Sequence, residues 1–272
     1  AAKIAQKSTA ESLETEAGSQ ARPRLFVIDF DGDMHASQVD ALREEISVLI
    51  PAATANDEIL IRLESPGGLV HSYGLAASQL QRIRDANISL TVAVDKVAAS
   101  GGYMMACVAT RIIAAPFAVI GSIGVIAQLP NFHRLLKKHD IDFELYTAGQ
   151  YKRTLTMFGE NTDTGRAKFV EDLEDTHELF KSFVADNRSV VDIEQVATGE
   201  VWYGQQALEV QLVDELSTSD TYIQSRLEDA DVLEIRYQFK KNWQERIGFS
   251  VENALYRAAL KLWQQGTSRQ LP

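Results

Sequence analysis

The stretch Ser89-Leu-Thr-Val-Ala-Val-Asp-Lys-Val-Ala-Ala-Ser-Gly-Gly-Tyr-Met-Met-Ala-Cys-Val-Ala109 decides how this chain folds. Its first six residues, Ser89–Val94, are rich in β-forming and apolar side chains, which predicts a buried strand. Small residues then surround Ser100, and an apolar run follows, which predicts a turn leading into a buried helix. A strand, a tight turn and a helix in this order are typical of an α/β domain.

The segments before this stretch continue the same alternation. Arg24–Phe30 and Glu58–Leu63 are strand-like runs. Ser37–Ile50 has apolar residues at helical spacing and predicts a helix that Pro51 stops. A further helical stretch follows the turn Ser65-Pro-Gly-Gly68 and reaches about Ala86. Because strands and helices alternate, we expect an α/β fold with a largely parallel sheet.

The second half of the chain alternates less regularly, and residues 24–239 are treated as one domain with a helical excursion near 160–200. Its expected strands are Arg111–Ala114, Ile123–Gln128, Phe143–Thr147 and Val232–Phe239, and its expected helices are Asn131–His139, Asp163–Asn187 and Ser217–Asp229.

The two ends differ from the domain between them. Residues 1–23 are rich in Ala, Ser, Glu and Gln and contain only two large aliphatic residues, so they predict a linker or a frayed helix. The chain starts at Ala1 rather than Met, and we expect a membrane anchor upstream of it. Residues 240–272 predict a basic amphipathic helix and a tail. This helix packs on its own domain, on a neighbouring subunit or on an anionic membrane.

Composition narrows the possible functions. The 272 residues are 45% hydrophobic and 24% charged, which is typical of a globular protein. A formal net charge of −11 repels phosphate backbones and argues against a nucleic-acid partner. The single cysteine, Cys107, excludes internal disulfides and cysteine-based metal clusters. Metal-binding and nucleotide-binding motifs are missing as well, so no metal and no cofactor is expected.

Two segments carry candidate catalytic groups. Ser100 lies between very small residues at the expected start of a helix, where the free N–H groups favour developing negative charge. It is a candidate nucleophile, although close packing with Ser100 as an N-cap explains the same pattern. Gly68 ends a turn directly after a strand, and its N–H is a candidate oxyanion donor; the alternative is an ordinary turn.

A serine nucleophile needs a base. Lys152 serves if burial among its apolar neighbours lowers its pKa and makes it neutral; the alternative is a surface lysine. Ser122, in Gly121-Ser-Ile-Gly-Val125, lies where a hydroxyl would bond to the base, or else in a buried bend. The five histidines have polar neighbours, and their spacing does not exclude a Ser-His-Asp triad.

Four pieces in this order resemble the signal peptide peptidase A family of serine–lysine peptidases. They are Ser65–Gly68, Ala99–Tyr103, Gly121–Val125 and Tyr151-Lys152, with Ser100 and Lys152 52 positions apart. The details Leu63-Glu-Ser-Pro-Gly-Gly-Leu-Val-His71 and Phe158-Gly-Glu-Asn161 are similar to the SohB branch of that family, which are bacterial inner-membrane peptidases. The resemblance covers roughly residues 24–239.

The resemblance implies a Clp-protease/crotonase-like spiral of β-β-α units. It also implies a membrane-anchored homo-oligomer, a ring or dome, whose catalytic domain faces the periplasm and cleaves hydrophobic, signal-peptide-like peptides. Carried over to this chain, Ser100 is the nucleophile, Lys152 the general base, Gly68 an oxyanion donor and Ser122 the residue that holds the lysine amine. From its position after Ser100, Gly101 is expected to supply a second N–H.

Two other functions stay open at this point. One is a crotonase-type acyl-CoA hydrolase or isomerase, which places paired N–H groups over a carbonyl without a Ser–Lys pair. The other is a non-catalytic assembly module that uses the 163–187 helix and the C-terminal helix to bind partners.

Overall fold

A computed structural model of the chain describes residues 22–238. The predicted C-terminal helix and all but the last two residues of the predicted N-terminal linker therefore lie outside the described residues. The chain divides into two compact units, Ala1–Arg236 and Tyr237–Pro272, and the fold described below is that of the first.

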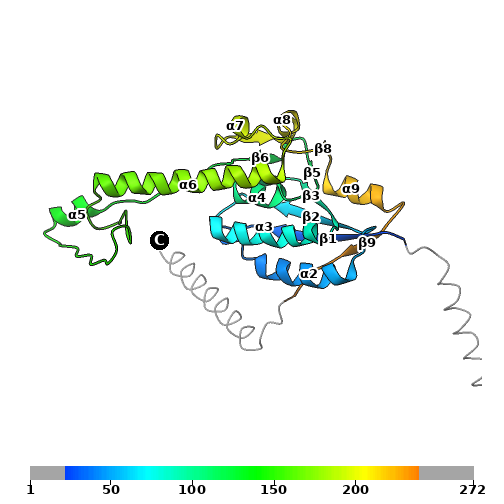
Figure 1. The fold of residues 1–272 in the computed structure, drawn as a ribbon, viewed down its shortest axis with the longest axis horizontal. Helices are drawn as coiled ribbons and strands as arrows, with labels where there is room; N and C mark the ends of the chain where they lie inside the picture. Colours follow the sequence, from blue (N-terminus) through cyan, green and yellow to red (C-terminus); the bar gives the residue numbers. More distant parts are fainter. Residues whose placement is uncertain (1–21, 239–272) are drawn as a thin grey trace, which may run out of the picture. The chain divides into compact units, whose positions relative to one another are not determined.

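A six-stranded parallel sheet forms the centre of this unit, as the alternating pattern predicts (Figure 1). Its strand order is β8-β5-β3-β2-β1-β9, and every neighbouring pair is parallel. The predictions for the strands that begin at Arg24, Glu58, Ser89 and Arg111 are confirmed. The strands are β1 (Arg24–Asp31), β2 (Glu58–Glu64), β3 (Ser89–Val94), β5 (Arg111–Ala114), β8 (Glu215–Leu216) and β9 (Asp231–Glu234).

Helices cover the two faces of the sheet unequally. One face packs against α2 (Val39–Ala52), α3 (Val70–Asp85) and α4 (Gly101–Ala106), and the large core lies between them. The other face has a smaller apolar cluster, in which Tyr222 of α9 (Ser219–Arg226) packs on β1 and β2. The side with α2, α3 and α4 therefore holds most of the buried apolar surface.

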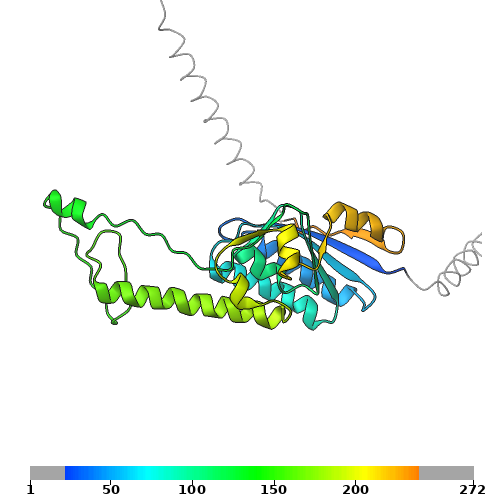
Figure 2. The same cartoon turned by 90° about the horizontal axis from the view of Figure 1, so that it is seen from above.

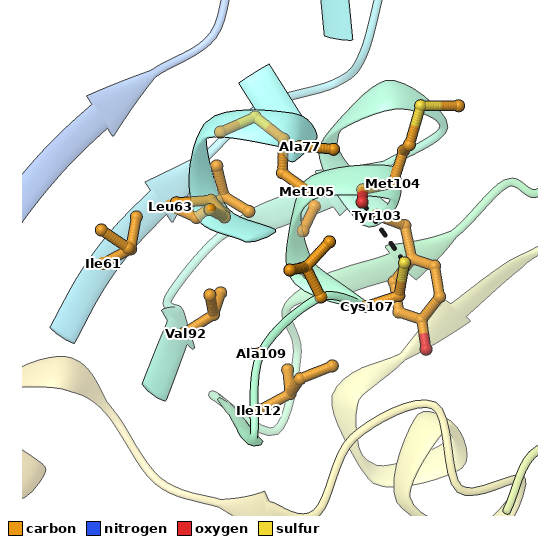
Figure 3. Packing of buried hydrophobic residues seen from close by; sticks show 14 of the residues in the cluster. Ile61, Leu63, Ala77, Val92, Tyr103, Met104, Met105, Cys107, Ala109 and Ile112 are labelled. Carbon is orange, nitrogen blue, oxygen red and sulfur yellow. Dashed lines mark hydrogen bonds between the residues drawn. The ribbon is translucent and has the colours of Figure 1, made fainter. Parts of the chain in front are cut away.

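Helix α4 is buried along its whole length. Figure 3 shows its side chains among those of Ile61, Val92 and Ile112 from the sheet. The hydroxyl of Tyr103 donates to the carbonyl of Leu212 at 2.9 Å and fixes the helix to a distant loop. Small residues such as Ala106 allow this close packing, as the sequence around Ser100 predicts.

The prediction that Pro51 stops the helix over 37–50 is wrong by two residues. Helix α2 includes Pro51 and ends at Ala52. Proline lacks an N–H, so the helix loses the one hydrogen bond that residue 51 would have donated. The N–H of Ala53 still donates to the carbonyl of Leu49 at 2.8 Å and closes the helix.

A second sheet of three short strands lies next to the candidate residues Ser100 and Ser122 in the sequence. Strand β4 (Val97–Ala99) is parallel to β6 (Val119–Gly121), and β6 is antiparallel to β7 (Val201–Tyr203). In this register Ala99 lies opposite Gly121. Ser100 and Ser122 therefore follow the ends of two neighbouring parallel strands. The short helices α7 (Ile193–Val196) and α8 (Gly204–Glu209) flank β7 in the sequence.

The long helix α6 (Asp163–Asn187) has the bounds predicted from the sequence. It extends beyond the sheet, and α5 (His133–Lys138) lies near its far end in both views (Figures 1 and 2). We call residues 126–162 the arm. The buried residues of α6, Phe180 and Val184, lie in the half that packs on the sheet domain, so its first half has little to hold it there.

Two strand predictions in this region are wrong. Residues 123–128 and 143–147 form no strand. Their apolar residues favour a strand locally, but a strand also needs a neighbour to accept its backbone hydrogen bonds. Phe143 instead packs its ring against that of Phe158, with ring centres 5.8 Å apart.

Candidate active site

The backbone of Ser100 has a conformation that is rare for a residue with a side chain. Its φ is 52° and its ψ is −118°. Its N–H donates to the carbonyl of Gly121 at 2.7 Å, and its carbonyl accepts from Met104 of α4 at 3.0 Å. Ser100 occupies the N-cap position, but its side chain makes no capping hydrogen bond. The hydroxyl is therefore available for chemistry, and the N-cap explanation does not hold for it.

Gly67 lies against the turn that contains Ser100. It has a φ of 89°, and a Cβ at this position would be 2.8 Å from the Cβ of Ser100 and 2.7 Å from the nitrogen of Gly101. Contacts this short exclude any side chain, so the glycine lets the two backbone segments touch. The turn Ser65–Gly68 is thus part of the same site as Ser100.

A buried chain of hydroxyl groups supports this glycine turn. The N–H of Gly67 donates to Ser65 Oγ at 3.1 Å, and Ser65 Oγ lies 2.6 Å from the hydroxyl of Tyr73. The Tyr73 hydroxyl donates in turn to the carbonyl of Asp33 at 2.7 Å. Burial raises the pKa of Tyr73, so its phenol keeps the proton that this bond requires.

The N–H groups of Gly68 and Gly101 find no acceptor among the described residues. Gly101 is the first residue of α4, where an N–H has no partner within the helix. Both glycines line a cavity together with Ser100. Two free N–H donors beside a free hydroxyl are the arrangement that stabilises an oxyanion in acyl transfer.

Two adjoining cavities share Ser100 in their linings. The first, which we call the apolar cavity, has a volume of about 370 Å³ and lies between α3 and α6. The second, the wide cavity, has a volume of about 870 Å³ and a more polar lining. Their distinctive residues are Val70, Met104, Phe180 and Phe183 in the apolar cavity, and Met34, Ser122, Gln128, His177 and Thr198 in the wide cavity.

Ser122 lies in the wide cavity, as does Ser100. It directly follows β6, has a φ of 50°, and its N–H donates to the carbonyl of Glu200 at 2.7 Å. Four of the five residues singled out in the sequence therefore come together: Ser100, Gly68, Gly101 and Ser122.

Lys152, the fifth residue, is not among the residues that line either cavity. It is exposed in a turn of the arm, with its N–H donating to the carbonyl of Gly149. Its neighbour Tyr151 lies beside Lys168 of α6, 5.8 Å from the amine to the ring centre. The residues of α6 that line the cavities begin at Thr176, about 12 Å further along the helix axis.

The burial that the sequence suggested for Lys152 is therefore not found within a single chain. Its apolar neighbours were expected to surround the amine. The turn at Gly149, which has a φ of 100°, leaves Lys152 on the outside of the arm instead.

His177 is a residue of the site that the sequence reasoning missed. It lies on α6, lines the wide cavity, and its Nε2 is 3.2 Å from the carbonyl oxygen of Ile123. The signal for this position is its spacing. His177 precedes the buried Phe180 and Val184 by three and seven residues, which places all three on one face of a helix.

Comparison with known proteins identifies the family of this site. Residues 82–233 match the profile of Peptidase family S49, and residues 1–80 match that of Peptidase family S49 N-terminal. The chain belongs to peptidase family S49. As an S49 member it is a peptidase. The family therefore argues against the two alternatives, an acyl-CoA enzyme and a non-catalytic module.

Named relatives indicate to which branch of the S49 family the chain belongs. The chain is 55% identical over 255 residues to the probable protease SohB of Haemophilus influenzae, covering 92% of this chain and 71% of that protein. It is 55% identical over 242 residues to a probable protease SohB of Buchnera aphidicola, covering 89% and 72%. A putative signal peptide peptidase SppA of Enterococcus faecium is 27% identical over 195 residues, covering 68% and 57%. These likenesses confirm the SohB branch of S49.

Solved structures confirm the fold. A membrane-bound stomatin-specific protease, as a lysine-to-alanine mutant with a substrate peptide, matches with a TM-score of 0.52 and 15% identity. The match covers 81% of this chain and 95% of that one. This S49 chain therefore has the expected Clp-protease/crotonase-like α/β fold. Within residues 22–238, no helix combines the length and apolar character that crossing a bilayer requires.

Proposed function

We propose that this chain is a serine endopeptidase with a Ser–Lys dyad, in which Ser100 is the nucleophile and Lys152 the general base. The observation that carries the proposal is the free hydroxyl of Ser100, at a strained turn between two cavities and beside the free N–H groups of Gly68 and Gly101. Strained backbone of this kind is concentrated at functional sites.

The first step is attack on a peptide carbonyl. Ser100 Oγ forms a bond to the carbonyl carbon and gives its proton to Lys152 Nζ, while the carbonyl oxygen becomes an oxyanion. The N–H groups of Gly68 and Gly101 donate to that oxyanion. The Lys152 ammonium then protonates the departing amine, and water hydrolyses the acyl-enzyme with Lys152 again acting as base.

Lys152 must be neutral to take this proton, and a solvated lysine has a pKa of about 10.4. Burial lowers the pKa of a lysine because it disfavours the charged form. The proposal therefore requires the arm to carry Lys152 into a wide cavity, where Ser122 would hold the amine. That cavity belongs either to the same chain, after the arm moves, or to a neighbouring copy in a ring.

The substrates proposed are hydrophobic, signal-peptide-like or membrane-associated peptides. The support is the apolar cavity beside Ser100, lined by Val70, Met104, Phe180 and Phe183. An apolar side chain next to the scissile bond would be buried there, and its burial would hold the carbonyl over Gly68 and Gly101.

We also propose that the protein acts at the bacterial inner membrane, as a homo-oligomer whose catalytic domain faces the periplasm. The structural likeness to a membrane-bound protease supports the membrane. The arm supports the oligomer, because it exposes more large apolar residues than solvent contact favours. Examples are Ile126, Leu135, Ile141, Phe143, Leu145 and Tyr146.

One observation favours a second candidate for the base. His177 lines the same cavity as Ser100, whereas Lys152 does not. However, a carbonyl oxygen only accepts hydrogen bonds, so His177 Nε2 carries its hydrogen toward Ile123. Only Nδ1 would be left to take the proton of Ser100.

The test is hydrolysis of a fluorogenic apolar peptide, together with labelling of Ser100 by a fluorophosphonate. Ser100→Ala should abolish both, and Lys152→Ala should abolish hydrolysis. Arg153→Ala is the matched control, since it removes the neighbouring exposed cation and should leave hydrolysis unchanged. Full activity in Lys152→Ala, with none in His177→Gln, would transfer the role of base to the histidine.

A further inference from the structure

The carbonyl oxygen of Ile123 joins three separate parts of the domain. It accepts the N–H of Gly199 at 3.1 Å and lies 3.2 Å from His177 Nε2 of α6. Both partners must donate, because a carbonyl oxygen only accepts. The Ile123 side chain is fully buried, so this junction is fixed to the core.

The same short segment holds the catalytic candidates. Two residues before Ile123, the carbonyl of Gly121 accepts the N–H of Ser100. The residues on either side of Ile123, Ser122 and Gly124, both line the wide cavity. A displacement at Ile123 would therefore be passed to the nucleophile and to the residue proposed to hold the lysine amine.

His177 lies at the point where α6 leaves the sheet domain. From Asp163 to Thr176 no residue of the helix is buried, and the first buried residue is Phe180. Among the side-chain hydrogen bonds of the described residues that join α6 to the sheet domain, the one made by His177 lies nearest to the arm. The first half of the helix packs on the arm instead: a Cβ on Gly165 would be 2.4 Å from the carbonyl oxygen of Thr154.

We propose that His177 is a positioning residue, which fixes the direction in which α6 presents the arm, and hence Lys152, relative to the sheet domain. This inference rests on the proposed function. The hydrogen bond to Ile123 acts as a tether between the wall of the site and α6, the helix on which the arm packs. Its loss is expected to reduce turnover rather than substrate binding, because the apolar cavity keeps its lining.

The experiment measures kcat and KM for the fluorogenic apolar peptide in the full chain. His177→Ala should lower kcat by roughly 10- to 100-fold, the range expected for a small displacement of catalytic groups. KM should stay within about threefold, since the binding surface is intact. His177→Gln keeps an N–H that reaches the same carbonyl and should restore most of kcat. Glu174→Ala, one turn away and exposed, is the matched control and should change nothing.

A second measurement does not depend on activity. Hydrogen exchange of the α6 amides before residue 177 should become faster in His177→Ala, by roughly tenfold, while the amides after Phe180 keep their rates. A merely local packing defect would speed exchange around Phe180 instead, and that result would overturn the proposal. Unchanged exchange throughout the helix would overturn it too.

The kinetic outcomes separate the two proposals. Wild-type kcat in His177→Ala would end the positioning role. Equal loss in His177→Gln and His177→Ala would also end it, because the imidazole itself would then be needed. If Ser100→Ala hydrolyses the peptide as fast as the wild type, the proposed function fails instead, and hydrogen exchange still decides whether the tether exists.

Discussion

The N–H of Ser100 donates to the carbonyl of Gly121 at 2.7 Å, one residue beyond the pair Ala99–Gly121 that ends the ladder between β4 and β6. The ladder thus fixes Ser100 on one side, while α4 begins directly on the other. Between these constraints the residue is held at a φ of 52°. Such a conformation costs roughly 1–3 kcal/mol in a residue with a Cβ. In this conformation the Ser100 hydroxyl makes no capping hydrogen bond to α4.

Replacing Ser100 should separate activity from stability. We expect Ser100→Ala and Ser100→Gly to lose peptide hydrolysis by at least about 1000-fold, as for other serine nucleophiles. The glycine variant should be more stable than the alanine variant by about 1 kcal/mol, because glycine relieves the strained φ. Urea unfolding measures the difference. Equal stability of the two variants would contradict the assignment of strain.

The control for this comparison is Ser78→Ala. Ser78 lines the apolar cavity, but its hydroxyl donates to the carbonyl of Gly74 at 2.8 Å within its own helix. We expect its hydrolysis rate to stay within about threefold of the wild type, because no reacting group is removed.

Mixing two inactive variants tests where Lys152 acts. The lysine lies on the arm and outside the cavities of its own chain, so we expect it to serve a neighbouring copy. Ser100→Ala mixed with Lys152→Ala during reassembly should then regain activity at roughly a quarter of the sites, as random mixing in a ring predicts. The control is Ser100→Ala mixed with a variant that carries both Ser100→Ala and Lys152→Ala. A dyad formed within one chain would leave both mixtures inactive.

The hydroxyl chain beneath Gly67 predicts an effect of Tyr73→Phe. Loss of the Tyr73 hydroxyl leaves the buried Ser65 hydroxyl with only the Gly67 N–H as a partner and should cost about 1–3 kcal/mol in the free energy of unfolding. The turn that presents Gly68 should loosen, and kcat should fall by roughly tenfold. Thermal unfolding and steady-state kinetics measure the two effects.

Tyr222→Phe is the matched control for that variant. It removes another buried tyrosine hydrogen bond, from Tyr222 to the carboxylate oxygen Oε1 of Glu58 at 2.6 Å, on the opposite face of the sheet. We expect a similar loss of stability with kcat unchanged. If both variants lowered kcat equally, the effect of Tyr73 would be a general consequence of lower stability.

The apolar cavity predicts the effect of a charge at its entrance. Val70→Asp places a carboxylate on the cavity lining, at the first residue of α3, where a helix tolerates an acid. KM for apolar peptides should rise by about tenfold, while labelling of Ser100 by a small fluorophosphonate stays unchanged. Leu75→Asp lies on the same helix outside the cavities and should leave KM as it is. An unchanged KM in Val70→Asp would exclude this cavity as the substrate site.

Acid unfolding should depend on Asp57. Burial acts to raise the pKa of its carboxyl, but hydrogen bonds from Arg24 and Thr54 outweigh it and hold the pKa well below the ordinary value. The stabilisation is therefore complete above about pH 4, the unfolded value, and is lost as the pH falls toward the folded value. Asp57→Asn should be less stable at pH 7 by about 1–3 kcal/mol.

The difference in the free energy of unfolding between Asp57→Asn and the wild type should then narrow below pH 4, because the carboxyl becomes protonated in the unfolded wild-type chain while it stays ionised in the folded one. Urea unfolding at pH 7, 4 and 3 measures it. A stability difference of constant size at the three pH values would show that the charge of Asp57 contributes nothing to the stability of the fold.

Local patterns predicted the elements whose stability is largely local or whose apolar residues repeat regularly. Strand β3 and helix α6 have the predicted bounds, and Ser100 lies between a strand and a helix as expected. The strands predicted at 123–128 and 143–147 failed, because strand formation depends on a neighbouring strand that the sequence does not reveal. His177 was missed because helical spacing places it on a face without showing what that face touches.

The sequence by itself determined the order of strands and helices, the small residues around Ser100 and the glycines beside it, because backbone conformation and side-chain size act within a few residues. Only the tertiary structure decided that Gly68, Gly101, Ser100 and Ser122 meet. The parallel pairing of β4 and β6 brings Ser122 to Ser100, and the bridge between Ser65 and Ala98 brings the turn of Gly68 there. Both contacts join segments that are distant in the chain. The structure likewise placed Lys152 on an exposed arm, because burial depends on what surrounds a side chain in space rather than on its neighbours in sequence.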